Sequence, residues 1–483
     1  MLQMASLVPT TRGRDKFRAK SIAESKAFYS DPDAATDSLW VAANYAWQTT
    51  VFLRNVTGAR IAAVANLYGS EFTPTMQQAA QNGEVVEIDL TSLQGFQPTS
   101  GLWSPAGHAL LRVASNTKGR MDFEGLLIRL SNAPAAPAAA AVFSPQKSAS
   151  AWVLACAIMR QAISQWSTWI GHVYHQHTTT AAVSFALYGT IEPGVPIGQA
   201  TTFNRLMADF FLDPSYREQF ASALFADGVT DFWSLLPGQQ LEATGLDGRV
   251  FQGKKREPFG AYPVVTFQRQ MRASIDTFTA KVVGRYYATD ADVAGDSQVQ
   301  AWLAAMIDPL GGNLGKINPN NTLSSRAELA RLWGDLIQLV LIHGVSHLQD
   351  YGARFGVPSS APAALGSSVL PDPSKSYTTQ ELMDYAPWTV NSAGKYAFMT
   401  AFIGSQPFTQ FVPSKGGPTG RPAWDAESPF GRGDAKSRAA SSALVTFRKG
   451  LTNFLKGFPQ DDIIRVLSTN WGQPTRLPRV IDM

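Results

Sequence analysis

The stretch WIGHVYHQHTTT, residues 169–180, contains three histidines within six positions, although the whole chain of 483 residues has only 6. These residues, His172, His175 and His177, lie in a long apolar segment for which we expect a helix. A neutral imidazole buried in such a helix needs partners for both of its ring nitrogens. The cluster therefore predicts a central helix that presents ligands to a metal ion.

A second cluster, His343 and His347, lies in another long apolar segment. The two residues are four positions apart, so they project from one face of an ordinary α-helix, as a chelating pair must. His172 and His177 are five positions apart, which separates them by about 140° on an ideal α-helix, whereas a wider π-type turn brings such positions together. His172 and His175 offer an ordinary-helix alternative, and the spacing does not decide between the two.

Four imidazoles exceed the number of ligands in a tetrahedral zinc site that keeps an open position. They favour a six-coordinate ion such as iron or manganese, and such a site still requires an anionic ligand. The alternative is that these histidines are unrelated polar residues of the core.

Apolar periodicity predicts a mainly helical chain from residue 146 onward. Two of the expected helices are long and apolar on all sides, as is typical of helices in the middle of a bundle. The acidic stretch TDADVAGD, residues 289–296, is expected to supply solvated carboxylates that cap helices. The expected helices span residues 148–190, 199–226, 262–287, 296–307, 324–354 and 433–457.

The N-terminal portion, residues 1–145, has a different pattern. Its first 70 residues have the apolar spacing of helices. Between about 85 and 131, the short alternating stretches EVVEIDL, HALLRVAS and FEGLLIRLS predict a small sheet. The Pro/Ala-rich residues 132–145 are expected to form a connector with little structure of its own.

Composition argues against several classes of protein. With 41 basic and 37 acidic residues and no polybasic run, the chain is not expected to bind nucleic acid. It shows neither a signal-peptide core nor a run of about 18 uncharged apolar residues that would predict a transmembrane segment. The single cysteine, Cys156, is expected to be a core residue, and the lack of disulfides favours a reducing compartment. We therefore expect a soluble, cytoplasmic protein.

The pattern His172-x4-His177 followed by His343-x3-His347 resembles the iron site of lipoxygenases, whose catalytic domain brings two such pairs together on long central helices. The stretch IDTFTAKVVGRYYATDADVAGDSQVQAWLAAM, residues 275–306, is similar to another segment of that family. There, a helix ends at a paired-tyrosine turn and is followed by an Asp-rich loop and a Gln-Ala-Trp helix. These matches identify the family that the chain resembles.

The last residues, PRVIDM, resemble the C-terminal sequence of lipoxygenases, whose terminal carboxylate binds the iron. By this resemblance Met483 supplies the anionic ligand through its main-chain carboxylate. The resemblance covers about residues 146–483 and has departures: Val195 replaces a histidine, and Thr168 and Asp350 replace glutamines that flank the family's ligands. The family's N-terminal lipid-binding β-barrel has no expected counterpart in this chain.

The resemblance implies a mainly α protein, a large helical bundle of lipoxygenase catalytic-domain type with a small β element near the N-terminus. Residues 1–145 would form a helical and β portion packed on the core, and residues 146–483 the catalytic domain. It implies one non-heme iron per chain, rather than manganese, with His175 not a ligand. The implied ligands are His172, His177, His343, His347 and Met483.

The implied activity is a dioxygenase that inserts O2 into an unsaturated, largely apolar small molecule, such as a polyunsaturated fatty acid, to give a hydroperoxide. A metal-bound hydroxide, rather than a side chain, would accept the hydrogen. Two alternatives stay open: a tailoring non-heme iron oxygenase that acts on another unsaturated or aromatic metabolite, and a non-catalytic helical protein that binds a metal or a lipid. The sequence assigns neither substrate-binding residues nor an oligomeric state.

Overall fold

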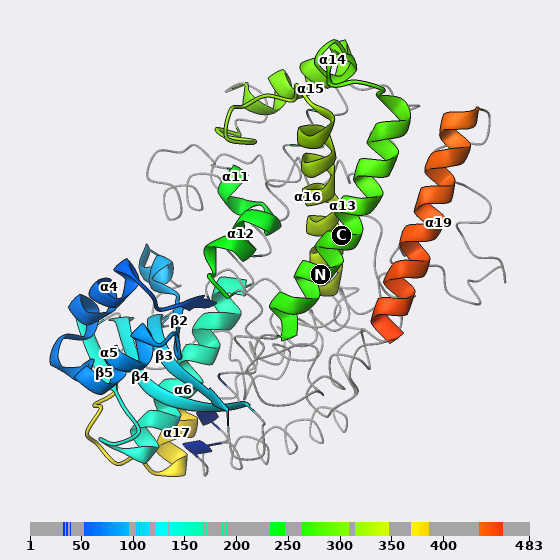
Figure 1. Ribbon diagram of the computed structural model, residues 1–483. Helices are drawn as coiled ribbons and strands as arrows, with labels where there is room; N and C mark the ends of the chain where they lie inside the picture. Colours follow the sequence, from blue (N-terminus) through cyan, green and yellow to red (C-terminus); the bar gives the residue numbers. More distant parts are fainter. Residues whose placement is uncertain are drawn as a thin grey trace, which may run out of the picture. The chain divides into compact units, whose positions relative to one another are not determined.

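Figure 1 shows a computed structural model of the chain, which is mainly α-helical with a small antiparallel sheet near the N-terminus. This is the fold class that the sequence predicts. The structure describes residues 32–33, 35–36, 39, 53–95, 103, 105–115, 121–133, 135–167, 171, 183, 186, 190, 232–246, 263–308, 314–346, 369–385 and 434–456.

The chain divides into two compact units, each assembled from separate parts of the sequence. The first comprises Met1–Gly171, Glu242–Val264 and His347–Ser405. The second comprises His172–Leu241, Val265–Ser346 and Gln406–Met483. The predicted boundary near residue 145 stays a prediction.

The sheet of the first unit has five strands in chain order, each antiparallel to the next. The three strands predicted from the alternating stretches are confirmed as β2, β3 and β4. The strands are β1 (Leu53–Asn55), β2 (Val85–Asp89), β3 (Ala106–Ser115), β4 (Met121–Ala133) and β5 (Ala136–Phe143).

Two local predictions are wrong. Leu53–Asn55 lies in a segment expected to be helical, yet it pairs with β2 as strand β1. Ala136–Phe143 lies in the expected connector, yet it pairs with β4 as strand β5. Its first five residues are exposed, so no alternation of apolar and polar residues marks it as a strand. The hydrogen bonds offered by the edge of β4 decide its conformation.

Helices cover both faces of the sheet. Successive residues of a strand point to opposite faces, and β3 uses this alternation directly. A Cβ on Gly107 would overlap the side chain of Met159 in α6 (Ala149–Gln165), whereas the next residue, His108, contacts Tyr68 of α4 (Ala59–Tyr68). Glycine at 107 therefore permits α6 to approach the sheet closely.

The core of the α4 side is a compact apolar cluster. It joins α4, the short 3-10 turn η2 (Gly69–Glu71) and α5 (Pro74–Gln81) to strands β2, β3 and β4. Its buried members are Val56, Val64, Tyr68, Phe72, Ala79, Ala80, Val85, Leu110, Leu126 and Leu127.

The remaining helices agree with the predicted ranges wherever the structure describes them; the range 199–226 lies outside the described residues. The short elements η3, α11, α12, α14 and α17 were not predicted separately. The predicted and unpredicted elements of this part of the chain are together η3 (Thr91–Gly95), α11 (Phe232–Leu235), α12 (Pro237–Ala243), α13 (Pro263–Tyr286), α14 (Asp290–Ala294), α15 (Ser297–Ile307), α16 (Arg326–Ser346), α17 (Thr379–Tyr385) and α19 (Ala435–Lys456).

Aromatic side chains join the three long helices of the second unit. Phe278 of α13 lies against Trp333 of α16 and stacks on Phe447 of α19, with ring centroids 5.5 and 5.0 Å apart. In α19 the buried residues Ser437, Ala440, Leu444 and Phe447 recur at three- and four-residue steps and so form one face. The second unit thus has the helical packing that the sequence predicts.

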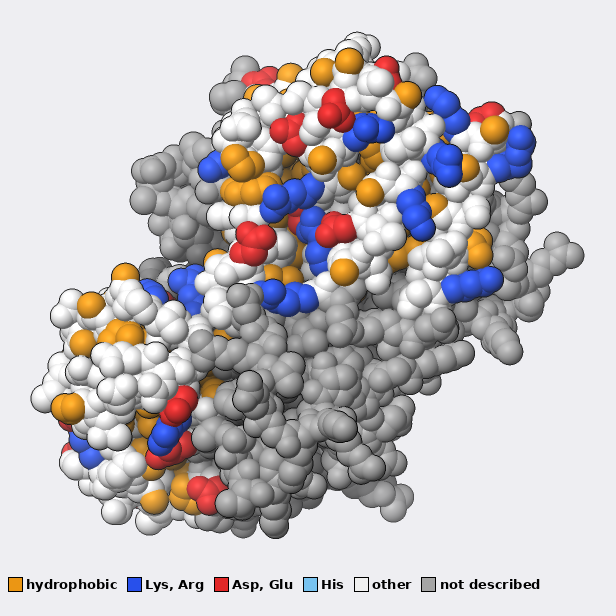
Figure 2. Space-filling view, in the orientation of Figure 1, with side chains coloured by type: hydrophobic (Ala, Val, Ile, Leu, Met, Phe, Trp, Pro, Cys, Tyr) orange, Lys and Arg blue, Asp and Glu red, His pale blue; other side chains and the backbone are white. Residues whose placement is uncertain are grey.

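The visible surface carries both signs of charge. Figure 2 shows Lys and Arg side chains interspersed with Asp and Glu over the described part of this face. Within the described ranges, no helix is both long enough and apolar enough to cross a membrane.

Candidate functional site

Only one of the five predicted metal ligands lies among the described residues. His343 lies in α16, three positions before the helix ends at Ser346, and only its backbone is described. The other predicted ligands and His175 lie outside the described residues, so the ligand set stays a prediction. The ligands concerned are His172, His177, His347 and Met483.

The helix that carries His343 is central before it reaches that residue. All eight residues from 332 to 339 are buried, so this part of α16 is covered on every side. A helix buried all round lies in the interior of a large protein rather than on its surface. The sequence prediction of a central helix is therefore confirmed for this part of α16.

The helix that leads towards the first histidine cluster is equally buried. All nine residues from 151 to 159 of α6 are buried, including Cys156, whose thiol pKa is raised by burial. The expectation that this cysteine is a core residue is confirmed. Beyond α6, Trp166, Ser167 and Gly171 have π-helical backbone geometry. π-helical geometry is thus observed just before the cluster, while the cluster itself lies outside the described residues.

A buried ion pair ties α16 to α13. The guanidinium of Arg272 contacts the carboxylate of Asp335, and the two side chains are 13% and 2% exposed. Arg272 also donates from Nε to Asp276 at 2.7 Å, and Gln338 donates to the carbonyl oxygen of Gln268 at 3.4 Å. Burial raises the pKa of Asp335, and Arg272 offsets only part of that effect. The pair therefore fixes the register of the helix that carries His343.

Glycine at 334 allows this close approach. A Cβ at Gly334 would lie 3.3 Å from Oδ1 of Asp276 and 3.4 Å from Cγ2 of Ile275, which is tighter than most such contacts.

On the same helix, Arg331 lies over the ring of Trp233, 4.4 Å from its centroid. Such a contact adds roughly 0.5–1 kcal/mol at an exposed site.

The acidic stretch after α13 acts as the sequence predicts. Thr289 and Asp292 form a capping box at the start of α14, and Asp296 accepts from two backbone N–H groups at the start of α15. Tyr287 donates to Asp296 at 2.7 Å, and burial together with this contact raises the pKa of the phenol. Asp290 accepts from the backbone N–H and the Nε of Arg326 at the start of α16. These carboxylates organise helix starts.

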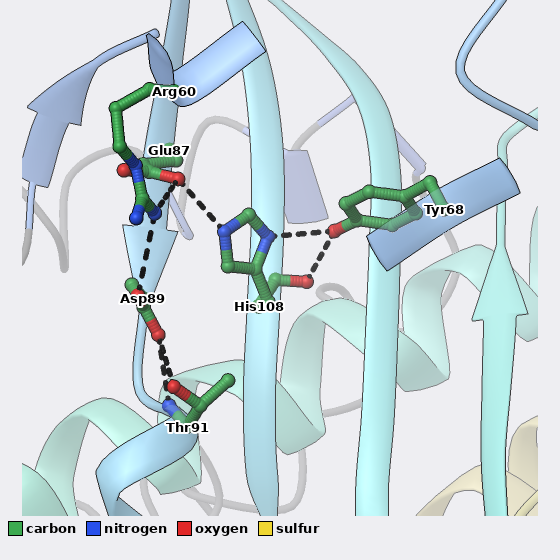
Figure 3. A network of polar contacts seen from close by, with 6 residues as sticks. All are labelled: Arg60, Tyr68, Glu87, Asp89, Thr91 and His108. Atoms are coloured by element: carbon green, nitrogen blue, oxygen red, sulfur yellow. Dashed lines mark hydrogen bonds and ion pairs between the residues drawn. The ribbon is translucent and has the colours of Figure 1, made fainter. Parts of the chain in front are cut away.

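A buried polar network in the first unit, drawn in Figure 3, was not predicted from the sequence. Arg60 donates to Glu87 at 2.6 Å, and Glu87 lies 2.9 Å from Nε2 of His108. Nδ1 of His108 lies 2.9 Å from the hydroxyl oxygen of Tyr68. Glu87 is 0% exposed and His108 is 1% exposed. The signal that could have revealed it was the presence of Glu87 and His108 inside otherwise apolar strands, because buried polar and charged groups require partners.

The charges in this network stabilise one another. Burial opposes ionisation of Glu87, yet hydrogen bonds from His108 and Arg60 outweigh it and hold the pKa of Glu87 below its ordinary value. Burial likewise opposes ionisation of Asp89, but hydrogen bonds from Thr91 and the charge of His108 lower its pKa. Burial raises the pKa of Tyr68 well above its ordinary value. The network therefore holds a carboxylate inside the protein.

The described residues contain no group of three or more His, Cys, Asp or Glu side chains that could hold a metal ion. The network of His108 supplies one imidazole beside one bound carboxylate and does not form such a group. Any metal site of this chain must therefore draw on residues beyond the described ranges.

Comparison with known proteins gives a clear result only at the level of structure. No family model and no curated protein sequence matches the chain. Among solved structures, the anaerobic crystal structure of an internal-deletion variant of LOX in complex with arachidonate has a TM-score of 0.63 and 14% sequence identity. The match covers 98% of this chain and 75% of that one.

Two further crystal structures of LOX with the same deletion match equally well. One has a TM-score of 0.64 and 16% identity, the other 0.63 and 15%, and each match covers 98% of this chain and 75% of the other. Identities this low establish the fold alone. The chain therefore has a fold similar to that of lipoxygenase structures along almost its whole length.

Proposed function

We propose that this chain is a lipoxygenase-like non-heme iron dioxygenase that inserts O2 into an unsaturated, largely apolar small molecule to give a hydroperoxide. The observation that carries the proposal is the similarity to lipoxygenase structures over 98% of the chain. The histidine pattern agrees with it, since α6 and α16, the two helices that lead towards the clusters, each contain a long stretch that is buried on every side.

The donor set fits a non-heme iron. Four neutral imidazoles and one carboxylate can occupy five positions of a six-coordinate ion and leave one open, which is more ligands than a tetrahedral zinc site accepts. When bound, iron would supply a one-electron acceptor for the cleavage of a carbon–hydrogen bond. The residues that would hold it are His172, His177, His343, His347 and the terminal carboxylate of Met483.

The chain itself would provide position and a dry environment. The buried part of α16 before His343 excludes water from that helix, and its tie to α13 through Arg272 and Asp335 restricts its movement. Exclusion of water protects a reactive carbon intermediate from side reactions. In the overall reaction one O2 adds to one substrate molecule, so no external reductant is needed.

The substrate class follows from composition and from the comparison. Charged residues make up only 16% of the chain, which favours an apolar binding pocket. One of the similar structures holds arachidonate, a polyunsaturated fatty acid, so this class is the first to test.

The test combines metal analysis with oxygen uptake. Purified protein is expected to hold about one iron per chain, to consume O2 with polyunsaturated fatty acids and to produce the absorbance of a conjugated diene. Uptake only with aromatic or other unsaturated metabolites would favour the tailoring oxygenase instead. Protein that holds zinc or no metal, or that holds iron but consumes no O2 with any member of the panel, would overturn the proposal.

A further inference from the structure

The helices α13 and α19 of the second unit carry an excess of positive charge that the rest of the chain does not share. Together they contain nine basic residues and one acidic residue, Asp276, whereas the whole chain has 41 basic and 37 acidic residues. Outside these two helices, acidic residues therefore outnumber basic ones. The nine basic residues are Arg269, Arg272, Lys281, Arg285, Lys436, Arg438, Arg448, Lys449 and Lys456.

The two helices lie side by side and run in opposite directions. Phe278 of α13 stacks on Phe447 of α19, with ring centroids 5.0 Å apart. Near the start of α19, the ammonium group of Lys436 donates to the carbonyl oxygen of Tyr286, the last residue of α13, at 3.2 Å. Positions after Phe278 in α13 therefore lie beside positions before Phe447 in α19, and basic residues of both helices come together.

Of the basic side chains that the structure describes on these helices, five are exposed. They are Lys281, Arg285, Lys436, Arg438 and Lys449, and they are termed the basic surface. Figure 2 shows Lys and Arg side chains over both helices on one face of the molecule. The basic surface is thus a local concentration of one sign of charge, although both signs occur elsewhere on that face.

Two carboxylates offset part of this charge near the start of α19. Asp434 accepts from the backbone N–H and the hydroxyl of Ser437 at 2.9 and 2.8 Å, and Asp292 lies close enough to Lys436 to interact with its charge. Farther along the two helices, Lys281, Arg285 and Lys449 form no ion pair with any residue of the described ranges. Their charge is available to an anion outside the protein.

The basic surface offers charge without an aromatic anchor. None of the exposed residues described on α13 and α19 is aromatic, whereas protein partners and single-stranded nucleic acids rely on such side chains. Arg438, Val445 and Lys449 are spaced by seven and four positions, so they share one face of α19. Val445 is 46% exposed between the two charges. An apolar side chain among basic ones favours the boundary between lipid headgroups and acyl chains.

We infer that the basic surface docks this chain on an anionic lipid bilayer. Lipid headgroups move laterally, so they can gather around separated Lys and Arg side chains without a fixed complementary shape. Each such side chain near an anionic bilayer strengthens binding about fivefold. The apolar substrate class proposed above dissolves in bilayers, so docking would bring the chain to its substrate. The docking itself does not rest on the proposed function, because it needs neither metal nor turnover.

Sedimentation of the full-length protein with vesicles tests the docking. Vesicles of phosphatidylcholine and phosphatidylglycerol in equal parts should bind the protein, whereas vesicles of phosphatidylcholine alone should not. The bound fraction should fall steeply between about 0.05 and 0.5 M NaCl, because salt screens exposed charges. Equal binding to both kinds of vesicle, or binding to neither, would overturn the inference.

A triple variant tests whether the basic surface makes the contact. Lys281→Gln, Arg285→Gln and Lys449→Gln together should weaken binding to the anionic vesicles roughly a hundredfold. All three side chains are exposed, so the fold should tolerate the changes, and circular dichroism checks this. Unchanged binding of the folded triple variant would contradict the inference.

The matched control lowers the net charge equally but leaves the basic surface intact. Arg112→Gln, Lys147→Gln and Lys375→Gln together remove three charges from the surface of the first unit, each of which pairs with a carboxylate. This protein should bind the anionic vesicles as the natural protein does. An equal loss of binding in the control would mean that net charge, rather than the basic surface, attracts the vesicles.

Duplex DNA of mixed sequence tests the other large polyanion. At the same salt and the same concentration of anionic charge, the protein should bind DNA more weakly than the anionic vesicles, because Val445 gains nothing from contact with phosphates. Tighter binding to DNA than to the vesicles would assign the basic surface to nucleic acid and overturn the inference.

Discussion

Asp335 of α16 and Arg272 of α13 form an ion pair inside the helical unit, with the carboxylate side chain only 2% exposed. Asp335 lies eight positions before His343 on the same helix. Buried charges are tolerated only when they are paired, so each of these residues requires the other. The pair gives α16 a fixed position on α13 that apolar contacts alone would specify less strictly.

Removal of one partner should therefore destabilise the folded protein strongly. Asp335→Asn is expected to lower the free energy of unfolding by about 3–5 kcal/mol, because it leaves the buried Arg272 with only the half-exposed Asp276 as a counter-ion. Urea denaturation measures this loss. Asp276→Asn is the matched control: Asp276 also accepts from Arg272 but is half exposed, so its loss should be smaller. Replacement of both buried partners, as in Arg272→Met with Asp335→Leu, should recover much of the stability; no recovery would show that the pair has a role beyond charge balance.

The predicted ligands can be tested one at a time. Replacement of His172, His177, His343 or His347 by Ala should each strip or greatly weaken the iron, because each removes one coordinating nitrogen. His175→Ala, in the same cluster, should retain the metal. Elemental analysis of purified proteins measures the ratio of iron to chain. The ligand set is wrong if none of the four substitutions alters metal content, or if His175→Ala alone does.

The C-terminal carboxylate gives a separate test. If Met483 binds the iron through its main-chain carboxylate, a few residues added after it should remove the iron. The added residues convert that carboxylate into an amide and move the new terminal carboxylate beyond the metal–oxygen bond length of about 2.1 Å. Met483→Ile keeps the carboxylate and should have almost no effect. Iron content and oxygen uptake of the extended and substituted proteins measure this. An extended protein with full iron and full activity would exclude the terminal carboxylate as a ligand.

Acid should weaken the first unit through Glu87. Its folded pKa lies below the ordinary value of 4.5, so its ionised form adds stability above that pH. This contribution is lost as the pH falls from 4.5 through the folded pKa. Hydrogen exchange of β2 between pH 6 and 3 should show the loss, and Glu87→Gln should flatten it. An unchanged acid dependence in Glu87→Gln would mean that other carboxylates control acid unfolding.

Two glycines should respond to alanine in opposite ways. A Cβ on Gly125 of β4 would overlap the ring of Trp152, a fully buried side chain of α6. Gly125→Ala should therefore cost about 1–3 kcal/mol by overpacking. Gly284 of α13 has no atom within 4 Å of the corresponding position, so Gly284→Ala should stabilise the helix by roughly 0.5–1 kcal/mol. Thermal unfolding measures both, and a stabilising Gly125→Ala would show that Trp152 can move.

The long helices could be predicted because their signal lies in local sequence. The mostly apolar segment 324–354 predicts a central helix, and within it residues 332–339 are all buried, the polar side chains of Asp335 and Gln338 included. The caps at Thr289 and Asp296 were also predictable, because a cap satisfies the first N–H groups of its own helix. Such features depend on residues a few positions apart, and the sequence by itself specifies them.

The edge strands and the polar network depended on partners far away in the chain. Ala136–Phe143 has no pattern of its own, and it is a strand because β4 offers it hydrogen bonds. Glu87 and His108 are 21 positions apart, and only the antiparallel pairing of β2 with β3 brings them to 2.9 Å. The sequence determined the positions of the long helices, the caps at Thr289 and Asp296 and the candidate metal ligands. Tertiary structure alone decided which charges are buried together, because desolvation and pairing exist only once distant segments meet.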